Sequence, residues 1–342
     1  MRIAFAPVST FNSNSNSNSS FISTSTLARV FAIVGAINLS CINCLLPVLP
    51  VLAGDGVSRA LYSREPGLDT VRKIMRDKNY NAAKPLLDAY LKKNPNSSLA
   101  LVYRSHCYVD ENKLKEALDC LYRAAKADPT NSEVYAEQAN IYAVQRQHQK
   151  AIDAATLSIK YGKRNSVKHM YHLRSMMLSG QGKYKKAIED MNSYLKIDSV
   201  KHRAYMWRAT AYEQDGQLDK AMADYRTGMQ ISKNYEYRFH TARVLQKQGK
   251  MEEAVAEMTA IIKQNPEEDE AWNKRGTLYF AMGKYQESVK DFTQALATSF
   301  GSNETIYRSR GRAYEKLGQK DLAQKDFKKA EELQKKPPVA PI

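Results

Sequence analysis

Cysteine is scarce in this chain, and its scarcity removes two classes of protein. There are 4 cysteines in 342 residues, too few for a disulfide-built scaffold, and no spacing of four Cys or His residues indicates zinc. Cys107 and Cys120 are the two beyond residue 53. We expect them to be small packing residues, although a bridge stays open because the sequence does not give the distance between their Cα atoms.

Motifs of catalysis are missing as well. The chain contains no Gly-rich phosphate loop, no Gly-x-Ser-x-Gly turn around a nucleophile and no His-Glu-x-x-His pair. His169 and His172 share a helix face and His202 lies farther on, but no carboxylate accompanies them in a known metal geometry. We therefore expect no enzyme, no cofactor and no metal site.

A long basic run is absent too, although the chain is strongly basic. Lys and Arg number 52 against 36 Asp and Glu, which gives a formal net charge of +16. The basic residues are interleaved with acids and no five are consecutive, so the pattern favours a solvated surface over a nucleic-acid groove. This charge still attracts acidic partners, and binding to polyanions or anionic surfaces is the alternative.

The N-terminal segment has its own composition. Residues 1–27 are rich in Ser and Asn, which predicts disorder. Residues 28–53 contain Arg29, then an uncharged stretch that ends with Val51-Leu52-Ala53 before Gly54. This is the pattern of a secretory signal, so we expect cleavage near Ala53, export to the periplasm or the exterior, and a linker over 54–63.

A membrane anchor is the alternative for residues 28–53. The 24 uncharged residues from 30 to 53 exceed the roughly 20 needed to span a bilayer. Pro47 and Pro50 oppose a spanning helix near its end. A lipid anchor at Cys41 is not supported, because Asn38-Leu39-Ser40 precedes it where Leu followed by two small residues is required. The membrane is thus an expected partner only if this segment stays uncleaved.

The rest of the chain repeats. A small residue returns at intervals of 33 to 36 residues, at Ala83, Ala117, Ala151, Ala187, Ala221, Ala254, Ser288 and Ala323. A period of this length indicates one supersecondary unit stacked on copies of itself, so that each copy buries its apolar face against its neighbours. The sequence therefore predicts a solenoid.

Other positions share this register, most clearly in the last two repeats. An aromatic residue, an Arg-Gly pair, a Tyr, the small residue, a Phe and an Ala follow in one order, at Trp272, Arg275-Gly276, Tyr279, Ser288, Phe292 and Ala295, and again at Tyr307, Arg310-Gly311, Tyr314, Ala323, Phe327 and Ala330. This order resembles the tetratricopeptide repeat (TPR) family. The resemblance implies an all-α, right-handed superhelical solenoid of about eight helix-turn-helix repeats.

The register gives the bounds of these repeats. They are expected at 64–97, 98–131, 132–167, 168–201, 202–234, 235–268, 269–303 and 304–335, with a Pro-rich tail over 336–342. Repeats four to eight have a glycine between their two helices, where a positive φ ends the first helix. Repeat three carries two extra residues, which predicts a looser or bent joint near residues 161–168.

Arg and Asp recur sixteen residues apart in four repeats. The pairs are Arg174 with Asp190, Arg208 with Asp224, Arg275 with Asp291, and Arg310 with Asp326. Because antiparallel helices bring these positions to equal heights, we expect a structural ion pair inside each repeat. Partly exposed pairs contribute about 0–1 kcal/mol each, so their expected role is to fix the register of the two helices.

The resemblance also implies where a partner binds. In this family the first helices line the inner wall of the superhelix, and residues at fixed positions point into its groove. Transferred by register, these residues are His106, Asn140, His169, His172, Met176, Arg203, Met206, Thr210, Phe239, Arg243, Asn273, Phe280, Arg308 and Arg312. The large apolar members would anchor a protein or peptide, and the C-terminal arginines would attract an acidic one.

One specialised use of the groove is excluded. A branch of the family clamps the C-terminal carboxylate of heat-shock chaperones with a Lys and an Asn four residues apart. Here Ala136 stands four residues before Asn140, and Asn273 occupies the position of the Lys. Chaperone-tail binding is therefore not expected.

The sequence thus favours an exported, non-enzymatic scaffold for protein–protein interaction. Two alternatives stay open, which are polyanion binding through the basic exterior and self-association within envelope or secretion machinery. Charged residues cover the end of repeat eight before Pro337, which is typical of a cap and disfavours open-ended stacking.

Overall fold

The computed structural model describes residues 65, 67–299 and 303–335. Every regular element in these ranges is an α-helix, and the sixteen helices follow one another in eight consecutive pairs. The prediction of an all-α superhelical solenoid built from about eight helical hairpins is confirmed. The segments 1–27, 28–53 and 54–63 and the tail 336–342, for which disorder, a signal, a linker and a Pro-rich end are predicted, lie outside the described residues.

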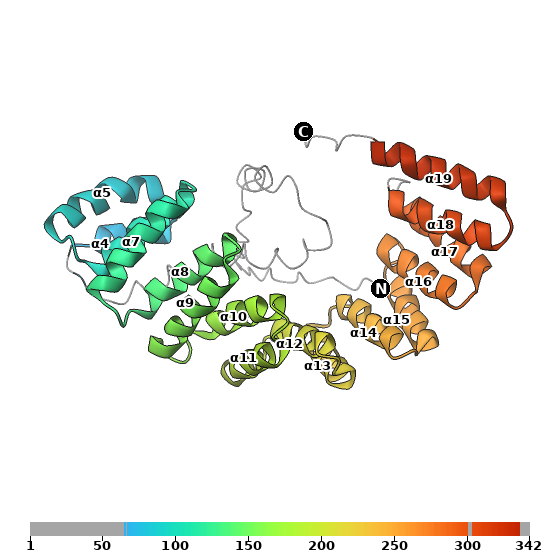
Figure 1. The fold of residues 1–342 in the computed structure, drawn as a ribbon, viewed down its shortest axis with the longest axis horizontal. Helices are drawn as coiled ribbons and strands as arrows, with labels where there is room; N and C mark the ends of the chain where they lie inside the picture. The colour runs from blue at the N-terminus through green and yellow to red at the C-terminus, as the bar shows by residue number, and fades with distance from the viewer. Residues whose placement is uncertain (1–64, 66, 300–302, 336–342) are drawn as a thin grey trace, which may run out of the picture. The chain divides into compact units, whose positions relative to one another are not determined.

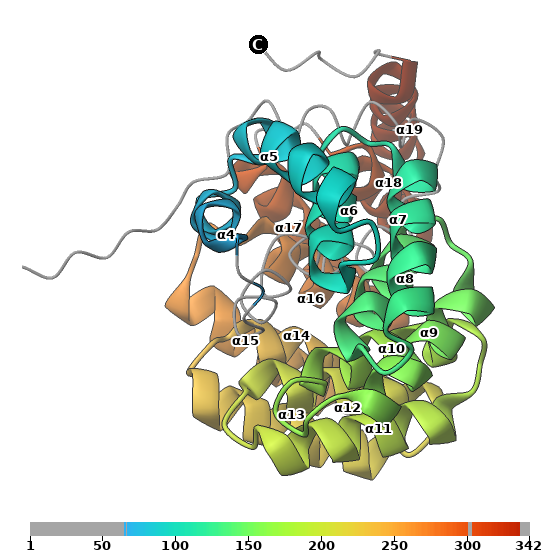
Figure 2. The same ribbon diagram turned by 90° about the vertical axis from the view of Figure 1, so that its left-hand side faces the viewer.

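Each pair consists of a first helix, a short turn and a second helix. In chain order the pairs are α4 (Asp69–Arg76) with α5 (Tyr80–Lys93), α6 (Ser98–Asp110) with α7 (Leu114–Ala127), α8 (Ser132–Val144) with α9 (His148–Tyr161), α10 (Lys168–Gly180) with α11 (Tyr184–Ile197), α12 (His202–Gln214) with α13 (Leu218–Ser232), α14 (Glu236–Lys247) with α15 (Met251–Gln264), α16 (Asp269–Ala281) with α17 (Tyr285–Thr298), and α18 (Glu304–Lys316) with α19 (Lys320–Lys335). Figure 1 shows that consecutive pairs lie side by side, and the turned view agrees for α6 to α9 (Figure 2).

In each hairpin the recurring small residue lies on the second helix, at the point where that helix packs on the first. These eight side chains, from Ala83 to Ala323, are at most 1% exposed. Large rings fill the space beside them, since Phe292 and Phe327 pack so closely on Gly276 and Gly311 that an added Cβ would lie 3.0 Å and 2.6 Å from a ring carbon. Small residues thus let the two helices of a hairpin approach, and rings complete the packing.

Neighbouring hairpins share their apolar cores. One buried cluster runs from Leu101 in α6 to Ile188 in α11 and Ala211 in α12. A second begins at Ala209 in α12 and reaches Leu278 in α16. Because contacts between adjacent hairpins supply this burial, no single hairpin holds the whole core.

The turn inside every hairpin has the same backbone conformation. Five residues before each small residue the chain takes a positive φ of 56–77°, at Lys78, Asn112, Arg146, Gly182, Gly216, Gly249, Gly283 and Gly318. Glycine adopts this conformation without steric cost, whereas other residues adopt it at a cost of roughly 1 kcal/mol. The turn geometry is therefore kept in repeats one to three although they lack the glycine.

The joint between repeats three and four is not looser than the others, contrary to expectation. The two extra residues lengthen the connection between α9 and α10, yet these helices contact each other as extensively as those at the other joints. Val167 is 4% exposed and packs on Gly162, where an added Cβ would lie 2.2 Å from its Cγ1. Arg164 also donates to the backbone oxygen of Lys196 at 2.8 Å. The insertion thus forms a packed turn.

Each of the four Arg–Asp pairs is joined by two parallel hydrogen bonds. Nε and Nη2 donate to the two carboxylate oxygens at 2.6–2.9 Å, in Arg174–Asp190, Arg208–Asp224, Arg275–Asp291 and Arg310–Asp326. The four carboxylates are only 5–9% exposed. Such buried bidentate pairs restrict the register of two helices more than exposed pairs do.

The third nitrogen of each guanidinium reaches the preceding hairpin. Nη1 donates at 2.8–3.0 Å to Thr156, Asn192, Thr259 and Thr293 from Arg174, Arg208, Arg275 and Arg310, respectively. Rings flank the same guanidiniums, as for Arg275 with Trp272 at 4.9 Å and Tyr279 at 5.8 Å from the ring centroids. We call this arrangement the arginine node, and it joins three helices from two repeats.

Repeats two and six alter the arginine node, and repeats one and three have neither its Arg nor its Asp. In repeat two, Cys120 occupies the position of the Asp, and Arg104 instead pairs with Asp88 of repeat one at 2.7 Å. In repeat six, Thr241 occupies the position of the Arg, while Arg238, one turn earlier, pairs with Glu257 at 2.6 Å. A cation and a carboxylate are thus kept near the node when their positions move.

The two cysteines are free thiols buried in repeat two. Burial raises the pKa of Cys107 to about 11 and also raises that of Cys120, so both stay protonated at neutral pH. Cys107 Sγ lies 3.7 Å from the backbone oxygen of Tyr80. They act here as small packing residues.

Replacing Gly228 with Ala will destabilise the solenoid. An added Cβ would lie 2.5 Å from the ring of Tyr237 in the next hairpin, and that ring is held by hydrogen bonds of its hydroxyl to His202. We expect the free energy of unfolding in urea to fall by about 1–3 kcal/mol. Gly180→Ala is the matched control because its Cβ would meet nothing within 4 Å, and it should be neutral or stabilising by up to about 1 kcal/mol. Equal effects of the two changes would contradict this account.

Replacing Asp291 with Asn will weaken an arginine node. The change removes the charge that Arg275 binds, so we expect a loss of about 1.5–3 kcal/mol in the free energy of unfolding. Glu287→Gln makes the same charge change at an exposed position of the same helix, and its effect should stay within about 0.5 kcal/mol. Urea titrations followed by circular dichroism at 222 nm compare them, and a neutral Asp291→Asn variant would show that the node adds no stability.

Candidate functional site

The first helices of adjacent hairpins form one continuous surface, here called the first-helix wall (α6, α8, α10, α12, α14, α16 and α18). Side chains connect neighbouring members of this wall. His106 of α6 contacts Glu137 of α8, His172 of α10 stacks on Trp207 of α12, and Lys274 of α16 lies over Phe239 of α14. The wall carries the fourteen positions that register assigns to partner binding.

Three of these positions are buried. His106, Asn140 and His172 are 9%, 3% and 3% exposed. A partner therefore does not reach them as they lie in this structure, because neighbouring side chains enclose them. His169 and His172 lie one turn apart on α10, but His169 is half-buried whereas His172 is buried.

The other eleven positions differ in the solvent exposure of their side chains. Arg203, Thr210, Arg243 and Arg312 are exposed. The half-buried positions are His169, Met176, Met206, Phe239, Asn273, Phe280 and Arg308. The part of the wall from α12 to α18 thus combines exposed polar groups with half-buried aromatic and thioether side chains.

His106 and Glu137 form a buried ion pair between α6 and α8. His106 Nε2 lies 3.4 Å from Glu137 Oε1. Burial works to lower the pKa of His106, but the charge of Glu137 outweighs it and the pKa is raised. For Glu137 burial works in the opposite direction, and His106 outweighs it, so the pKa of Glu137 is lowered. The pair favours its charged form.

Three polar atoms in this part of the wall have no hydrogen-bond partner among the described residues. They are His106 Nδ1, Asn140 Oδ1 and His172 Nε2, on three successive first helices. His172 also stacks on Trp207, with ring centroids 3.4 Å apart, and burial lowers its pKa to about 3. A buried polar atom left unpaired costs about 1–3 kcal/mol, so this region holds unused hydrogen-bonding capacity.

A charged cluster at the centre of the wall was not identified from the sequence. The carboxylate of Glu213 in α12 receives Arg243 Nε and Nη2, both at 2.8 Å, and Lys247 Nζ at 2.8 Å. The hydroxyl of Tyr225 donates to it at 3.1 Å. We call Glu213, Tyr225, Arg243 and Lys247 the Glu213 cluster. Lys247 lies 34 residues after Glu213, which is one repeat length. This spacing is the sequence signal from which the contact between the two residues could have been predicted.

The Glu213 carboxylate is buried while its cations are not. Glu213 is 1% exposed in its side chain, against 47% for Arg243 and 45% for Lys247. Burial works to raise the pKa of Glu213, but the hydrogen bonds from Arg243 and Lys247 outweigh it and lower the pKa. The cluster is therefore a fixed, ionised anion that holds two half-exposed cations.

The C-terminal end of the wall carries a basic stripe. Arg308, Arg312 and Lys316 lie four residues apart on one face of α18. Arg308 pairs with Glu304 at 2.7 Å, whereas Arg312 and Lys316 have no ion pair among the described residues. Like charges at this spacing repel each other by a few tenths of a kcal/mol, so the stripe leaves positive charge at this end of the wall.

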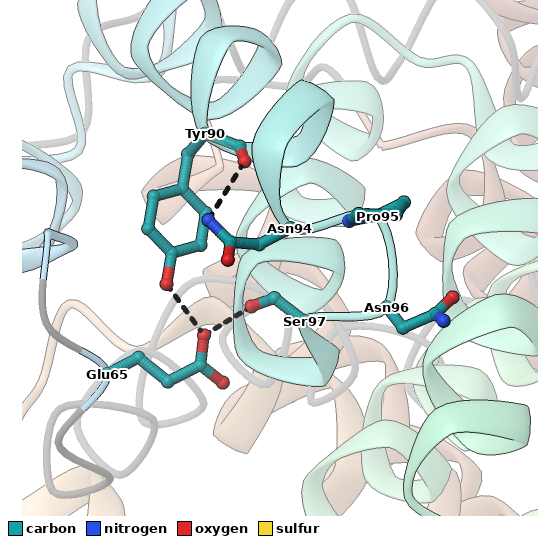
Figure 3. Close-up of a pocket in the computed structure, with 6 residues that line it drawn as sticks. All are labelled: Glu65, Tyr90, Asn94, Pro95, Asn96 and Ser97. Atoms are coloured by element: carbon teal, nitrogen blue, oxygen red, sulfur yellow. Dashed lines mark hydrogen bonds between the residues drawn. The ribbon is translucent and has the colours of Figure 1, made fainter.

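A hollow of about 400 Å³ lies at the other end of the solenoid (Figure 3). It is lined by Glu65, Tyr90, Asn94, Pro95, Asn96 and Ser97. The hydroxyls of Tyr90 and Ser97 both donate to the Glu65 carboxylate, and Asn94 Nδ2 donates to the backbone oxygen of Tyr90 at 3.3 Å. The Asn96 side chain points away from this group. These bonds fasten residue 65 to the turn between α5 and α6, and they do not converge on a ligand.

Among residues 65, 67–299 and 303–335, no group of three or more His, Cys, Asp or Glu side chains is arranged to hold a metal ion. Over the same ranges, no helix combines the length and apolarity needed to cross a membrane.

Several solved structures are similar to this chain. A tetratricopeptide repeat protein from Parabacteroides merdae is 14% identical with a TM-score of 0.49, and the match covers 81% of this chain and 100% of that one. The MamA protein is 20% identical with a TM-score of 0.42, covering 51% and 98%. YrrB, described as a TPR protein with an unusual peptide-binding site, is 14% identical with a TM-score of 0.40, covering 62% and 91%.

Sequence comparison identifies the family. Human tetratricopeptide repeat protein 6 is 24% identical over 197 residues, which are 56% of this chain, and the match spans only 37% of the human protein. Models of the tetratricopeptide repeat match residues 75–154, 178–232, 236–267 and 267–336, which together exceed half of the chain. With the eight hairpins and their shared register, these matches show that the chain belongs to the tetratricopeptide repeat family.

Proposed function

We propose that this protein is a non-enzymatic scaffold that holds a segment of a partner protein along its first-helix wall, the concave face of the superhelix. The observation that carries the proposal is the row of side chains from α12 to α18. Half-buried Met206, Phe239 and Phe280 alternate there with exposed Arg203 and Arg243. Binding energy in protein interfaces is concentrated in such aromatic and Arg anchors.

The polar groups of the wall support the same proposal. His106, Asn140 and His172 carry unpaired atoms that the main chain of a bound segment could satisfy after a local rearrangement. The buried carboxylates of Asp190, Asp224, Asp291 and Asp326 are each held by an arginine in a structural role. We therefore propose no catalytic step.

Self-association through the last repeat is the less favoured use of the fold. The outer surface of α19 exposes charged residues, including Lys325, Lys328, Lys329, Glu331 and Glu332. Apart from Leu322, which is 44% exposed, the exposed side chains of this helix are polar, and such a surface is typical of the end of a stack of repeats.

Binding along the wall can be tested by site-specific photo-cross-linking. Benzoylphenylalanine at the exposed wall positions Thr210 and Thr277 should form adducts with a protein partner in cells. The same group at Tyr122, which is 53% exposed on the second helix α7, is the matched control and should form few. Adducts from Tyr122 alone, or equal yields from all three positions, would place the partner elsewhere.

We also propose that the protein acts outside the cytoplasm after cleavage near Ala53. The support is the composition of residues 28–53, which combine Arg29, an uncharged stretch and a small residue before Gly54. A membrane-anchored protein is the alternative that the same uncharged stretch allows.

A reporter fusion tests the location. Alkaline phosphatase, which is active only after export, should be active when fused after residue 64, and the mature fusion should lack the first 53 residues by N-terminal sequencing. A fusion of normal abundance without activity would contradict export. An active fusion that retains residues 28–53 in the membrane fraction would establish the anchor instead.

A further inference from the structure

The Glu213 cluster contains more positive charge than its carboxylate neutralises. Glu213 binds Arg243 through two nitrogens, and that bidentate pair alone balances the two charges. Lys247 Nζ then adds a second cation at 2.8 Å from the same carboxylate. The cluster therefore has an excess of one positive charge.

The two cations of the cluster are held in position by hydrogen bonds to buried groups. Both oxygens of Glu213 are occupied, one by Arg243 Nε and Lys247 Nζ and the other by Arg243 Nη2 and the hydroxyl of Tyr225. Tyr225 is fully buried, and its ring stacks on His240 with centroids 4.9 Å apart. The two cations are thus positioned by a buried support while about half of each side chain faces outward. A binding group whose position is set before the ligand arrives loses less entropy on binding.

The surroundings of the cluster are apolar and hydroxylic with one further cation, since Lys274 lies over the ring of Phe239. Phe239 lies one turn before Arg243 on α14 and is half-buried, as is Met206 on α12. Thr210 is exposed, and its hydroxyl lies 3.2 Å from that of Tyr225. A ligand that suits this site has an acidic group and a large apolar group close together.

We infer that the Glu213 cluster is a carboxylate-binding subsite of the first-helix wall, and that its ligand is an acidic, amphipathic peptide segment of the partner protein. A carboxylate side chain would accept from Lys247 Nζ and from Arg243 Nη1, while a neighbouring apolar side chain would pack on Phe239. This inference rests on the proposed scaffold function and specifies its ligand.

The same features argue against a nucleic acid at this site. Binding to a phosphate backbone gains affinity from many cations along a track, whereas this site offers the excess charge of the cluster and Lys274, which lies over the ring of Phe239. Two cationic groups beside apolar side chains suit an alternating acidic and apolar peptide better.

The test compares two labelled peptides by fluorescence polarisation on the full chain. One is a twelve-residue repeat of Leu-Glu-Glu and the other replaces every Glu with Gln. We expect the acidic peptide to bind at least about 10-fold more tightly, because the cluster offers charged donors. The single-stranded oligonucleotide (dT)12 is the third probe and should bind more weakly than the acidic peptide.

Lys247→Gln is the decisive variant because Arg243 still donates to both oxygens of Glu213. It should weaken the acidic peptide about 3- to 10-fold, equivalent to one charged contact, and leave the Gln peptide unchanged. Lys247→Arg should retain affinity. Lys263→Gln is the matched control, since it removes the same charge from an exposed position on the second helix α15, and it should change nothing.

A second variant guards against a folding defect. Thr210→Glu places a negative charge on the exposed surface beside the cluster and should weaken binding of the acidic peptide without affecting the circular dichroism spectrum.

The inference is overturned if both peptides bind equally, if Lys247→Gln has the same effect as Lys263→Gln, or if (dT)12 binds most tightly and its binding depends on Lys247. Photo-cross-links from Thr277 that persist in such a case would preserve the scaffold function while removing this ligand class.

Discussion

The close approach of two helices at one small side chain is the contact on which the rest of the structure depends. Ala83 and its seven equivalents are enclosed in every hairpin, and nothing larger fits between the two backbones there. This approach brings rings such as Phe292 onto Gly276 and sets the height at which Arg275 meets Asp291. A larger residue would separate the helices and shift both contacts together.

The arginine nodes convert this local packing into a link between repeats. A guanidinium has donors on two edges, so Arg275 can bind Asp291 in its own hairpin and Thr259 in the preceding one. Lysine could not replace it, because a single ammonium does not present two fixed edges. Either member of the pair can move, since in repeat two Arg104 keeps its position and its carboxylate is Asp88 of the preceding hairpin, whereas in repeat six Glu257 keeps the carboxylate position and the cation is Arg238.

The features that could be predicted from the sequence are those determined within a single repeat. The hairpins, the enclosed small residues and the Arg–Asp register follow from spacings inside one copy, and the structure has them. Contacts between copies depend on the angle at which hairpins stack, which no single repeat encodes. The burial of His172 against Trp207 and the contact of Glu213 with Lys247 were missed for this reason. Likewise, Arg146 takes the turn conformation of a glycine because the hairpin imposes it.

The joint between repeats five and six differs from its neighbours in how it resists bending. Thr241 replaces the node arginine, and Arg226 replaces the Thr or Asn that would receive it, so no node spans this joint. The two hairpins are linked here by the ion pair between Arg243 and Glu213 and by the packing of the Tyr237 ring on Gly228. This joint is therefore held partly by a charge–charge contact that weakens with ionic strength, whereas the node-bearing joints are spanned by hydrogen bonds from a guanidinium to a neutral Thr or Asn side chain.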